Sequence, residues 1–96
     1  MDIKQTGIAG TMESSDVMVT IQPGSKGIEI EIESIVDKQF GREIRRAITE
    51  TLRDMDVKNA RVKAVDKGAL DCTIRARVKT AVCRSSGKAL YEWKVS

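Results

Sequence analysis

The stretch GIEIEIESIVDKQFGREIRRAITETL, residues 27–52, decides the fold class because it contains two hydrophobic periodicities in succession. Its first part, residues 27–34, alternates Ile with Glu, which predicts a β-strand with one buried face. Its second part places apolar residues three and four positions apart, with Arg and Glu between them. This spacing predicts an amphipathic helix over residues 35–55. A strand that leads into such a helix is typical of an α+β domain.

The start of this helix has a candidate cap. Ser34 is followed three residues later by Asp37, a spacing that resembles a capping box. The predicted apolar face then consists of Val36, Phe40, Ile44, Ala47, Ile48, Thr51, Leu52 and Met55.

Two further strands are predicted before residue 27. In DVMVTIQP, residues 16–23, the residues Val17, Val19 and Ile21 share one face. The turn-forming sequence QPGSKG then predicts a hairpin that pairs this strand with the one over residues 27–34. An earlier strand over residues 3–9 is also plausible.

The second half of the chain predicts one more strand and one more helix. NARVKAV, residues 59–65, alternates apolar and polar residues. Helical spacing returns over residues 69–84, with Asp66 as a candidate cap. A strand over residues 72–78 is the competing interpretation, because apolar positions also alternate there. The tail, residues 85–96, has no firm pattern, although its Tyr and Trp could pack it onto the domain.

The predicted order is therefore β-β-β-α-β-α. We expect residues 1–96 to form one small two-layer α+β domain, in which an antiparallel sheet is covered on one face by about two helices.

Composition argues against catalysis by this chain. It contains no histidine, which removes the commonest general base, the commonest metal ligand and any histidine-activated nucleophile. The two cysteines, Cys72 and Cys83, would lie about 16 Å apart on one helix, beyond disulfide reach. We expect no catalytic residue, no metal site and no membrane-spanning segment, and a cytoplasmic location.

Charge is unevenly distributed along the chain. Residues 1–33 contain two lysines and six acids, whereas residues 34–96 contain fifteen Lys or Arg and eight acids. A basic half is compatible with a small nucleic-acid-binding or scaffold domain. Solvated helix faces are the preferred explanation for most of these charges, and three aromatic residues offer little for base stacking.

The sequence GTMESSD, residues 10–16, places Ser14 and Ser15 in a polar segment between two strands. The simplest interpretation is an ordinary turn whose side chains hydrogen-bond the backbone. A serine without a base is no nucleophile, but an exposed one can be modified by another enzyme. Few apolar residues anchor the segment, so we expect it to be more mobile than the helix over residues 35–55. Strand alternation alone leaves open which serine is exposed.

Three separated motifs resemble one known family. GIAGTMESSDVMVTIQP, VDKQFGREIRRAITETL and VKAVDKGALDCTIRARV are similar, in order and spacing, to the acyl carrier subunit (gamma chain) of citrate lyase. The resemblance extends over about residues 3–84. The family of fatty-acid acyl carrier proteins is different, because their Asp-Ser-Leu attachment motif is missing here.

The resemblance implies a carrier that is not itself an enzyme. Ser14, directly after the glutamate, would carry 2'-(5''-phosphoribosyl)-3'-dephospho-CoA through a phosphodiester, with Ser15 as a spacer. The thiol of this group would hold the acetyl or citryl thioester while citrate is cleaved to oxaloacetate and acetate. The implied partners are the alpha (acyl transferase) and beta (citryl lyase) subunits and a prosthetic-group transferase, in an oligomeric complex of citrate fermentation. The carrier subunit of malonate decarboxylase is the alternative within the same class.

Overall fold

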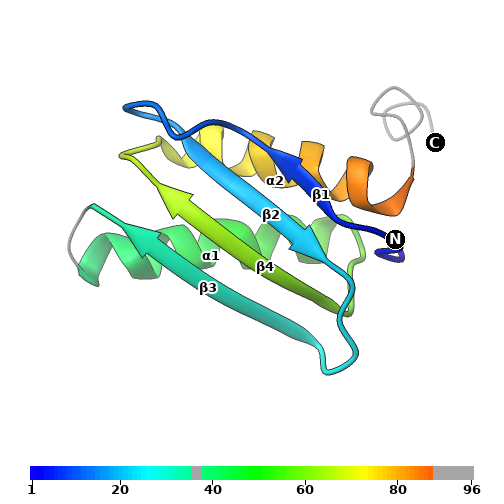
Figure 1. The fold of residues 1–96 in the computed structure, drawn as a ribbon. Helices are drawn as coiled ribbons and strands as arrows, with labels where there is room; N and C mark the ends of the chain where they lie inside the picture. The colour runs from blue at the N-terminus through cyan, green and yellow to red at the C-terminus, as the bar shows by residue number, and fades with distance from the viewer. Residues whose placement is uncertain (36–37, 88–96) are drawn as a thin grey trace.

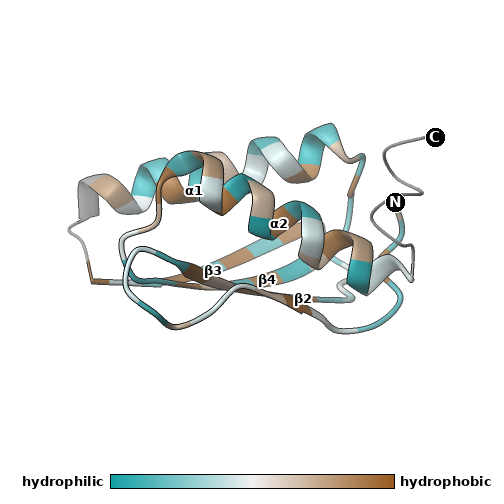
Figure 2. Ribbon diagram, turned by 90° about the horizontal axis from the view of Figure 1, so that it is seen from above, coloured by the Kyte–Doolittle hydropathy of each residue, from teal (hydrophilic) through white to brown (hydrophobic). Residues whose placement is uncertain are grey.

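Four strands and two helices follow one another in the predicted order in the computed structural model, which describes residues 1–35 and 38–87 (Figure 1). The elements are β1 (Gly7–Ala9), β2 (Val17–Gln22), β3 (Ile28–Ser34), α1 (Lys38–Asp54), β4 (Ala60–Asp66) and α2 (Asp71–Ser86). Both helices lie on the same side of the sheet, as the view from above shows (Figure 2). The two-layer α+β architecture is confirmed.

The core lies between the sheet and the two helices. Val17, Val19 and Ile21 of β2 are fully buried, as their alternation predicts. The helices contribute the residues at three- and four-residue spacing, because one stripe of each helix faces the sheet. These buried helical residues are Ile44, Ala47, Ile48, Thr51, Leu52, Ile74, Val78, Ala81, Val82 and Cys83. Phe40, also predicted on the apolar face, is exposed.

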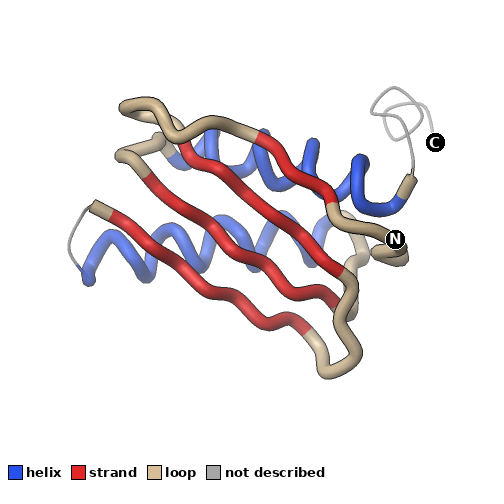
Figure 3. Tube along the Cα trace, viewed as in Figure 1, coloured by secondary structure: helices blue, strands red, loops and turns tan. Residues whose placement is uncertain are grey.

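The strand order is β1-β2-β4-β3, which corrects two expectations (Figure 3). The predicted hairpin between β2 and β3 is wrong, because β4 lies between them and pairs with both. The sheet is also mixed rather than antiparallel. β2 pairs with β1 and β4 in antiparallel fashion, whereas β3 and β4 are parallel.

The connection between β2 and β3 is long enough to pass the start of β4. Its five residues, 23–27, can span about 16 Å, more than the two strand spacings of roughly 10 Å that it must cross. Hydrogen bonds fix this crossing: the Ala60 amide donates to the Gly27 carbonyl at 3.0 Å, and the Gly27 amide donates to Asn59 Oδ1 at 2.9 Å. Turn-forming residues at this point therefore indicated a change of direction and not a pairing partner.

The start of α1 lies beside residues that the structure does not describe. Ser34 is the last residue of β3, and its hydroxyl donates to Asp66 Oδ2 at 2.9 Å. Asp37, its predicted partner in the capping box, and Val36 lie outside the described residues, so the capping box stays a prediction. The helix begins in the structure at Lys38 and ends at Asp54, within the predicted range.

The second helix is confirmed, and the competing strand over residues 72–78 is wrong. Asp66 does not cap it, because the helix begins only at Asp71 and the residue before it, Leu70, makes no side-chain cap. Asp66 instead accepts hydrogen bonds from the Gly68 and Ala69 amides, at 3.2 and 3.0 Å, and so shapes the turn that precedes the helix.

The helix also extends past its predicted end at residue 84. Ser85 and Ser86, expected in the tail, are its last two residues and are buried. Gly87 then ends it in the left-handed conformation that favours glycine, with φ of 80°. The rest of the tail, with Tyr91 and Trp93, lies outside the described residues.

Strand β1 lies against α2 at a very short distance. A Cβ added at Gly7 would overlap the Ala81 carbonyl oxygen and the Ser85 amide nitrogen, both of them backbone atoms. The short strand is also bonded from the helix side, because Arg84 Nη1 donates to the Ile8 carbonyl at 2.6 Å. Glycine at residue 7 therefore allows the N-terminal edge of the sheet to pack on α2.

Candidate functional site

The two serines occupy the centre of a β-turn between β1 and β2. The Asp16 amide donates to the Glu13 carbonyl at 3.2 Å, which closes a four-residue turn with Ser14 and Ser15 at its two central positions. Ser15 has φ of 66°, as the second central residue of a type II turn requires a positive φ. Both serines are exposed. The turn interrupts the strand pattern, so strand alternation does not decide the exposure of either serine.

The Ser14 hydroxyl has no hydrogen-bond partner within residues 1–35 and 38–87. The simplest interpretation of the segment, a turn whose side chains hydrogen-bond the nearby backbone, is confirmed for Thr11 and Asp16, which accept hydrogen bonds from nearby amides. Modification of Ser14 stays a prediction. An exposed hydroxyl at the first central position of a turn is accessible to a second protein.

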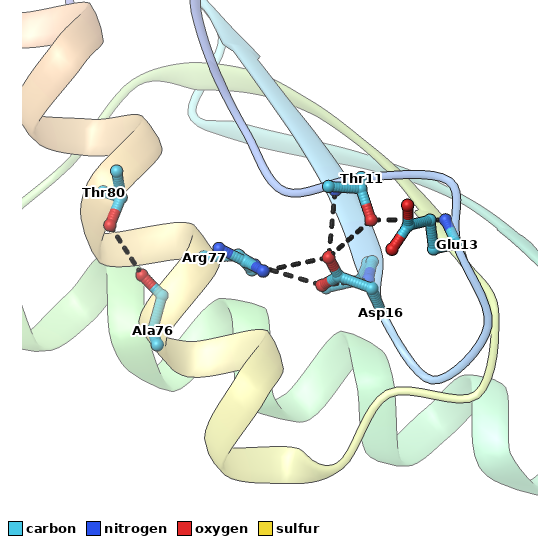
Figure 4. Close-up of polar contacts among 7 residues, drawn as sticks. Thr11, Glu13, Asp16, Ala76, Arg77 and Thr80 are labelled. Atoms are coloured by element: carbon cyan, nitrogen blue, oxygen red, sulfur yellow. Dashed lines mark hydrogen bonds and ion pairs between the residues drawn. The ribbon is translucent and has the colours of Figure 1, made fainter.

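Asp16, two residues later, points inward and organises the turn (Figure 4). Arg77 of α2 binds it in bidentate fashion: Nε donates to Oδ1 at 3.0 Å, and Nη2 donates to Oδ2 at 2.9 Å. Oδ2 also accepts from the Thr11 amide at 3.1 Å and the Thr11 hydroxyl at 2.7 Å. Oδ1 accepts from the Val17 amide at 2.7 Å. One carboxylate thus joins both ends of the turn to the second helix.

These hydrogen bonds stabilise the ionised form of Asp16. The Arg77 guanidinium is the largest cause, followed by the Thr11 hydroxyl and the Val17 amide, and together they hold the pKa of Asp16 well below its usual range. Burial of the carboxylate acts in the opposite direction but is outweighed. Asp16 is therefore a permanently charged structural group at neutral pH and no proton donor.

A second set of backbone hydrogen bonds joins the turn to the end of β4. The Ser15 amide donates to the Lys67 carbonyl at 2.8 Å, and the Lys67 amide donates to the Asp16 carbonyl at 2.9 Å. Asp66, just before, is buried and pairs in register with Val17. Hydrogen bonds thus hold the segment of residues 10–16, which has few apolar residues to anchor it. The expected mobility of this segment stays a prediction.

Gly10 permits the entry into the turn. Its φ of 96° is a conformation that L-residues rarely adopt, and an added Cβ would overlap the Val17 carbonyl oxygen. The glycine in GTMESSD therefore belongs to the geometry of the turn.

The two cysteines differ in their environment. Cys83 is buried, which raises the pKa of its thiol, and Cys72 is exposed. Across residues 1–35 and 38–87, no group of three or more Cys, Asp or Glu could hold a metal ion. Neither helix is long and apolar enough, over those same residues, to cross a membrane.

Many basic residues of the second half have partners within the protein. Arg75 contacts Glu50 at 2.7 Å and Asp71 at 2.6 Å. Further pairs and carbonyl contacts involve Arg45, Arg46, Arg61, Lys63, Arg77 and Arg84. These internal contacts weaken the case for a nucleic-acid surface, for which uneven charge was the sole support.

Neither Arg77 nor the role of Asp16 is indicated by the sequence. The two residues are 61 positions apart, and neither belongs to a recognisable pair in the sequence. The helical spacing that placed Val78 in the core could have indicated that Arg77 lies beside the sheet, but not which acid it contacts.

Known proteins with similar sequences are acyl carrier proteins. Residues 4–85 match a family model described as acyl carrier protein, malonate decarboxylase delta subunit. The chain is 58% identical, over 95 residues, to the citrate lyase acyl carrier protein of Streptococcus mutans. The match covers 98% of this chain and 93% of that protein. It is 56% identical to that of Streptococcus uberis and 52% identical to that of Latilactobacillus sakei, each with the same coverage.

A solved structure shares the fold. A chain in the crystal structure of a Pseudomonas malonate decarboxylase hetero-tetramer in complex with malonate superposes with a TM-score of 0.65. The match covers 85% of this chain and 89% of that one, at 23% sequence identity. At this identity the likeness concerns the fold alone.

Proposed function

Because this chain belongs to the family of citrate lyase acyl carrier proteins, we propose that Ser14 is the residue to which the prosthetic group of a citrate lyase is attached. The chain is an acyl carrier, and its role is to hold an acyl group for other subunits. The proposed group is 2'-(5''-phosphoribosyl)-3'-dephospho-CoA, joined by a phosphodiester to Ser14 Oγ.

The hydroxyl of Ser14 is exposed at the corner of a turn and has no hydrogen-bond partner in the described residues, so a phosphodiester there would break no hydrogen bond among them. The Ser15 hydroxyl is exposed and without such a partner as well, so exposure alone does not separate the two serines. The choice of Ser14 rests on its position directly after Glu13, which matches the family motif.

The residues present fit a carrier and its attached group. When bound, the group supplies a thiol that holds an acyl group as a thioester. This chain's own residues anchor that group and keep its attachment point outside the core, because the turn projects beyond the end of the sheet (Figure 1). A long tether raises the effective concentration of the acyl group at partner sites, so the carrier needs no acid–base pair of its own.

The proposed partners are the alpha subunit, which transfers the acyl group, the beta subunit, which cleaves the citryl thioester, and a transferase that attaches the prosthetic group. The proposed location is the cytoplasm. The malonate decarboxylase alternative is not favoured, because the citrate lyase carriers are 52–58% identical over nearly the whole chain, against 23% for the malonate decarboxylase structure.

Mass spectrometry of the chain purified from its native complex tests the proposal. We expect an intact mass increased by that of the phosphodiester-linked group, and peptide mapping that locates the adduct on Ser14. Ser14→Ala should fold normally, because the hydroxyl has no hydrogen-bond partner in the described part of the chain, and should accept no group from the transferase.

Ser15→Ala is the matched control, since it removes the adjacent hydroxyl and leaves Ser14 in place. It should be modified as the unaltered chain is. An adduct on Ser15, or modification of the Ser14→Ala variant at the normal rate, would refute the assignment.

A further inference from the structure

We propose that Asp16 and Arg77 are positioning residues for attachment of the prosthetic group: their contact fixes the turn in the conformation that presents Ser14 to the transferase. The transferase would then recognise a folded turn, not the local sequence GTMESSD alone. This inference rests on the proposed function of Ser14.

The Asp16 carboxylate is saturated with hydrogen bonds. Its two oxygens accept five, from Arg77 Nε and Nη2, the Thr11 amide and hydroxyl, and the Val17 amide, all between 2.7 and 3.1 Å. Bidentate contact with a guanidinium fixes direction as well as distance, because both groups are planar. The carboxylate side chain is only 13% exposed, so water competes weakly for these bonds.

These contacts act on both ends of the segment that contains Ser14. Thr11 lies before the turn and Asp16 ends it, and the same carboxylate holds both to α2. The Thr11 hydroxyl also accepts from the Glu13 amide at 3.2 Å. In consequence none of the hydrogen bonds described for the turn uses the Ser14 hydroxyl.

A turn fixed in this way is already in the conformation that a partner must bind. An unfixed segment loses conformational entropy on binding, and that loss weakens binding and lowers kcat/KM.

In the proposed transfer the Ser14 hydroxyl gives its proton to a base of the transferase as its oxygen forms a bond to phosphorus. The phosphoanhydride bond of an activated nucleotide donor breaks, and the phosphate leaving group takes the electron pair. The positioning residues touch none of these atoms.

Substitution of Arg77 tests the inference with the full-length chain, the cognate transferase and its activated donor. Arg77→Gln removes the charge and the bidentate contact, and we expect kcat/KM for modification to fall about tenfold, chiefly through a higher KM for the carrier. Arg77→Lys keeps the charge without the planar fork and should recover part of the loss. Intact mass against time gives the rates.

Val82→Ala is the matched control for stability. Val82 lies on the same helix and is fully buried, so its truncation destabilises the fold. None of the hydrogen bonds described for the turn involves Val82. At a temperature where all variants are folded by circular dichroism, Val82→Ala should be modified at the normal rate. Backbone ¹⁵N order parameters should fall for residues 13–15 in Arg77→Gln but not in Val82→Ala.

The outcomes distinguish the positioning role of Asp16 and Arg77 from the attachment of the group to Ser14. Modification of folded Arg77→Gln with unchanged kcat/KM would overturn the positioning role and leave Ser14 as the attachment residue. An equal loss of kcat/KM in Val82→Ala would overturn it too, because general stability would then explain the effect. Failure of the unaltered chain to accept the group on Ser14 would overturn the proposed function and this inference with it.

Discussion

Ser15→Gly is predicted to stabilise the protein while Ser14 remains the site of modification. Ser15 has φ of 66°, in the left-handed region, where a residue with a Cβ costs about 1–2 kcal/mol. Glycine removes that cost but adds about 0.4–1 kcal/mol of backbone entropy to the unfolded chain. The net expectation is a gain of about 0.5–1 kcal/mol in the free energy of unfolding.

A gain of this size should raise the Tm of a domain this small by roughly 4 °C. No native contact is lost, because Ser15 Oγ has no partner within the described residues and the amide that donates to Lys67 is retained. Thermal unfolding followed by circular dichroism measures the shift, and mass spectrometry after incubation with the transferase measures modification.

Two further substitutions of Ser15 serve as controls. Ser15→Ala keeps the Cβ and should change stability by less than about 0.5 kcal/mol. Ser15→Val adds β-branching at a positive φ and should be clearly destabilising. If Ser15→Gly lowered the Tm, the left-handed conformation of residue 15 would be refuted, and if it abolished modification, Ser15 and not Ser14 would be the attachment residue.

Three other predictions follow from the packing and the charges. Gly7→Ala should lower the free energy of unfolding by about 2 kcal/mol or more in urea titration, because the new methyl group meets backbone of α2 that cannot move aside; an unchanged midpoint would contradict the packing. The pKa of Asp16 is lower in the folded than in the unfolded chain. The contribution of its ionised carboxylate to the free energy of unfolding is therefore complete above about pH 4 and is lost as the pH falls. The Asp16→Asn variant should therefore have a free energy of unfolding about 1–3 kcal/mol lower at pH 7, and this free energy should fall less between pH 4 and pH 2 than that of the unaltered chain. Parallel profiles of stability against pH would argue against the contact between Asp16 and Arg77. With a thiol reagent under native conditions, Cys72 should react readily and buried Cys83 only after unfolding, and equal rates would show that α2 is not packed as described.

Elements could be predicted from the sequence because their signals are local. The alternation in β2 and β3 and the helical spacing in α1 and α2 each lie within one short window, and all four elements were placed within a few residues of their observed bounds. Pairing could not be predicted in the same way. Alternation shows that a strand has one buried face, but both the hairpin and the observed order bury the same faces of β2 and β3.

The sequence motif indicates Ser14 as the candidate site but not the contacts around it. The structure gives Ser14 an exposed hydroxyl without a hydrogen-bond partner in the described residues, and its modification stays a prediction. In the sequence Asp16 resembles any other polar turn residue. Its role depends on the contact with Arg77, which is 61 positions away along the chain. Asp66 shows the same limit: an acid just before a helix predicts a cap, whereas the fold uses it to order the preceding turn and to bind Ser34.

The central position of β4 has a consequence for the synthesis of this protein. The proposed attachment residue, Ser14, emerges from the ribosome early. However, β2 pairs with only the short β1 until residues 60–66 are made, and the turn meets its partners Lys67 and Arg77 later still. About four fifths of the chain must therefore be translated before the turn can take its final shape. A transferase that requires this shape would leave nascent and truncated chains unmodified, so only carriers able to complete their sheet would be loaded.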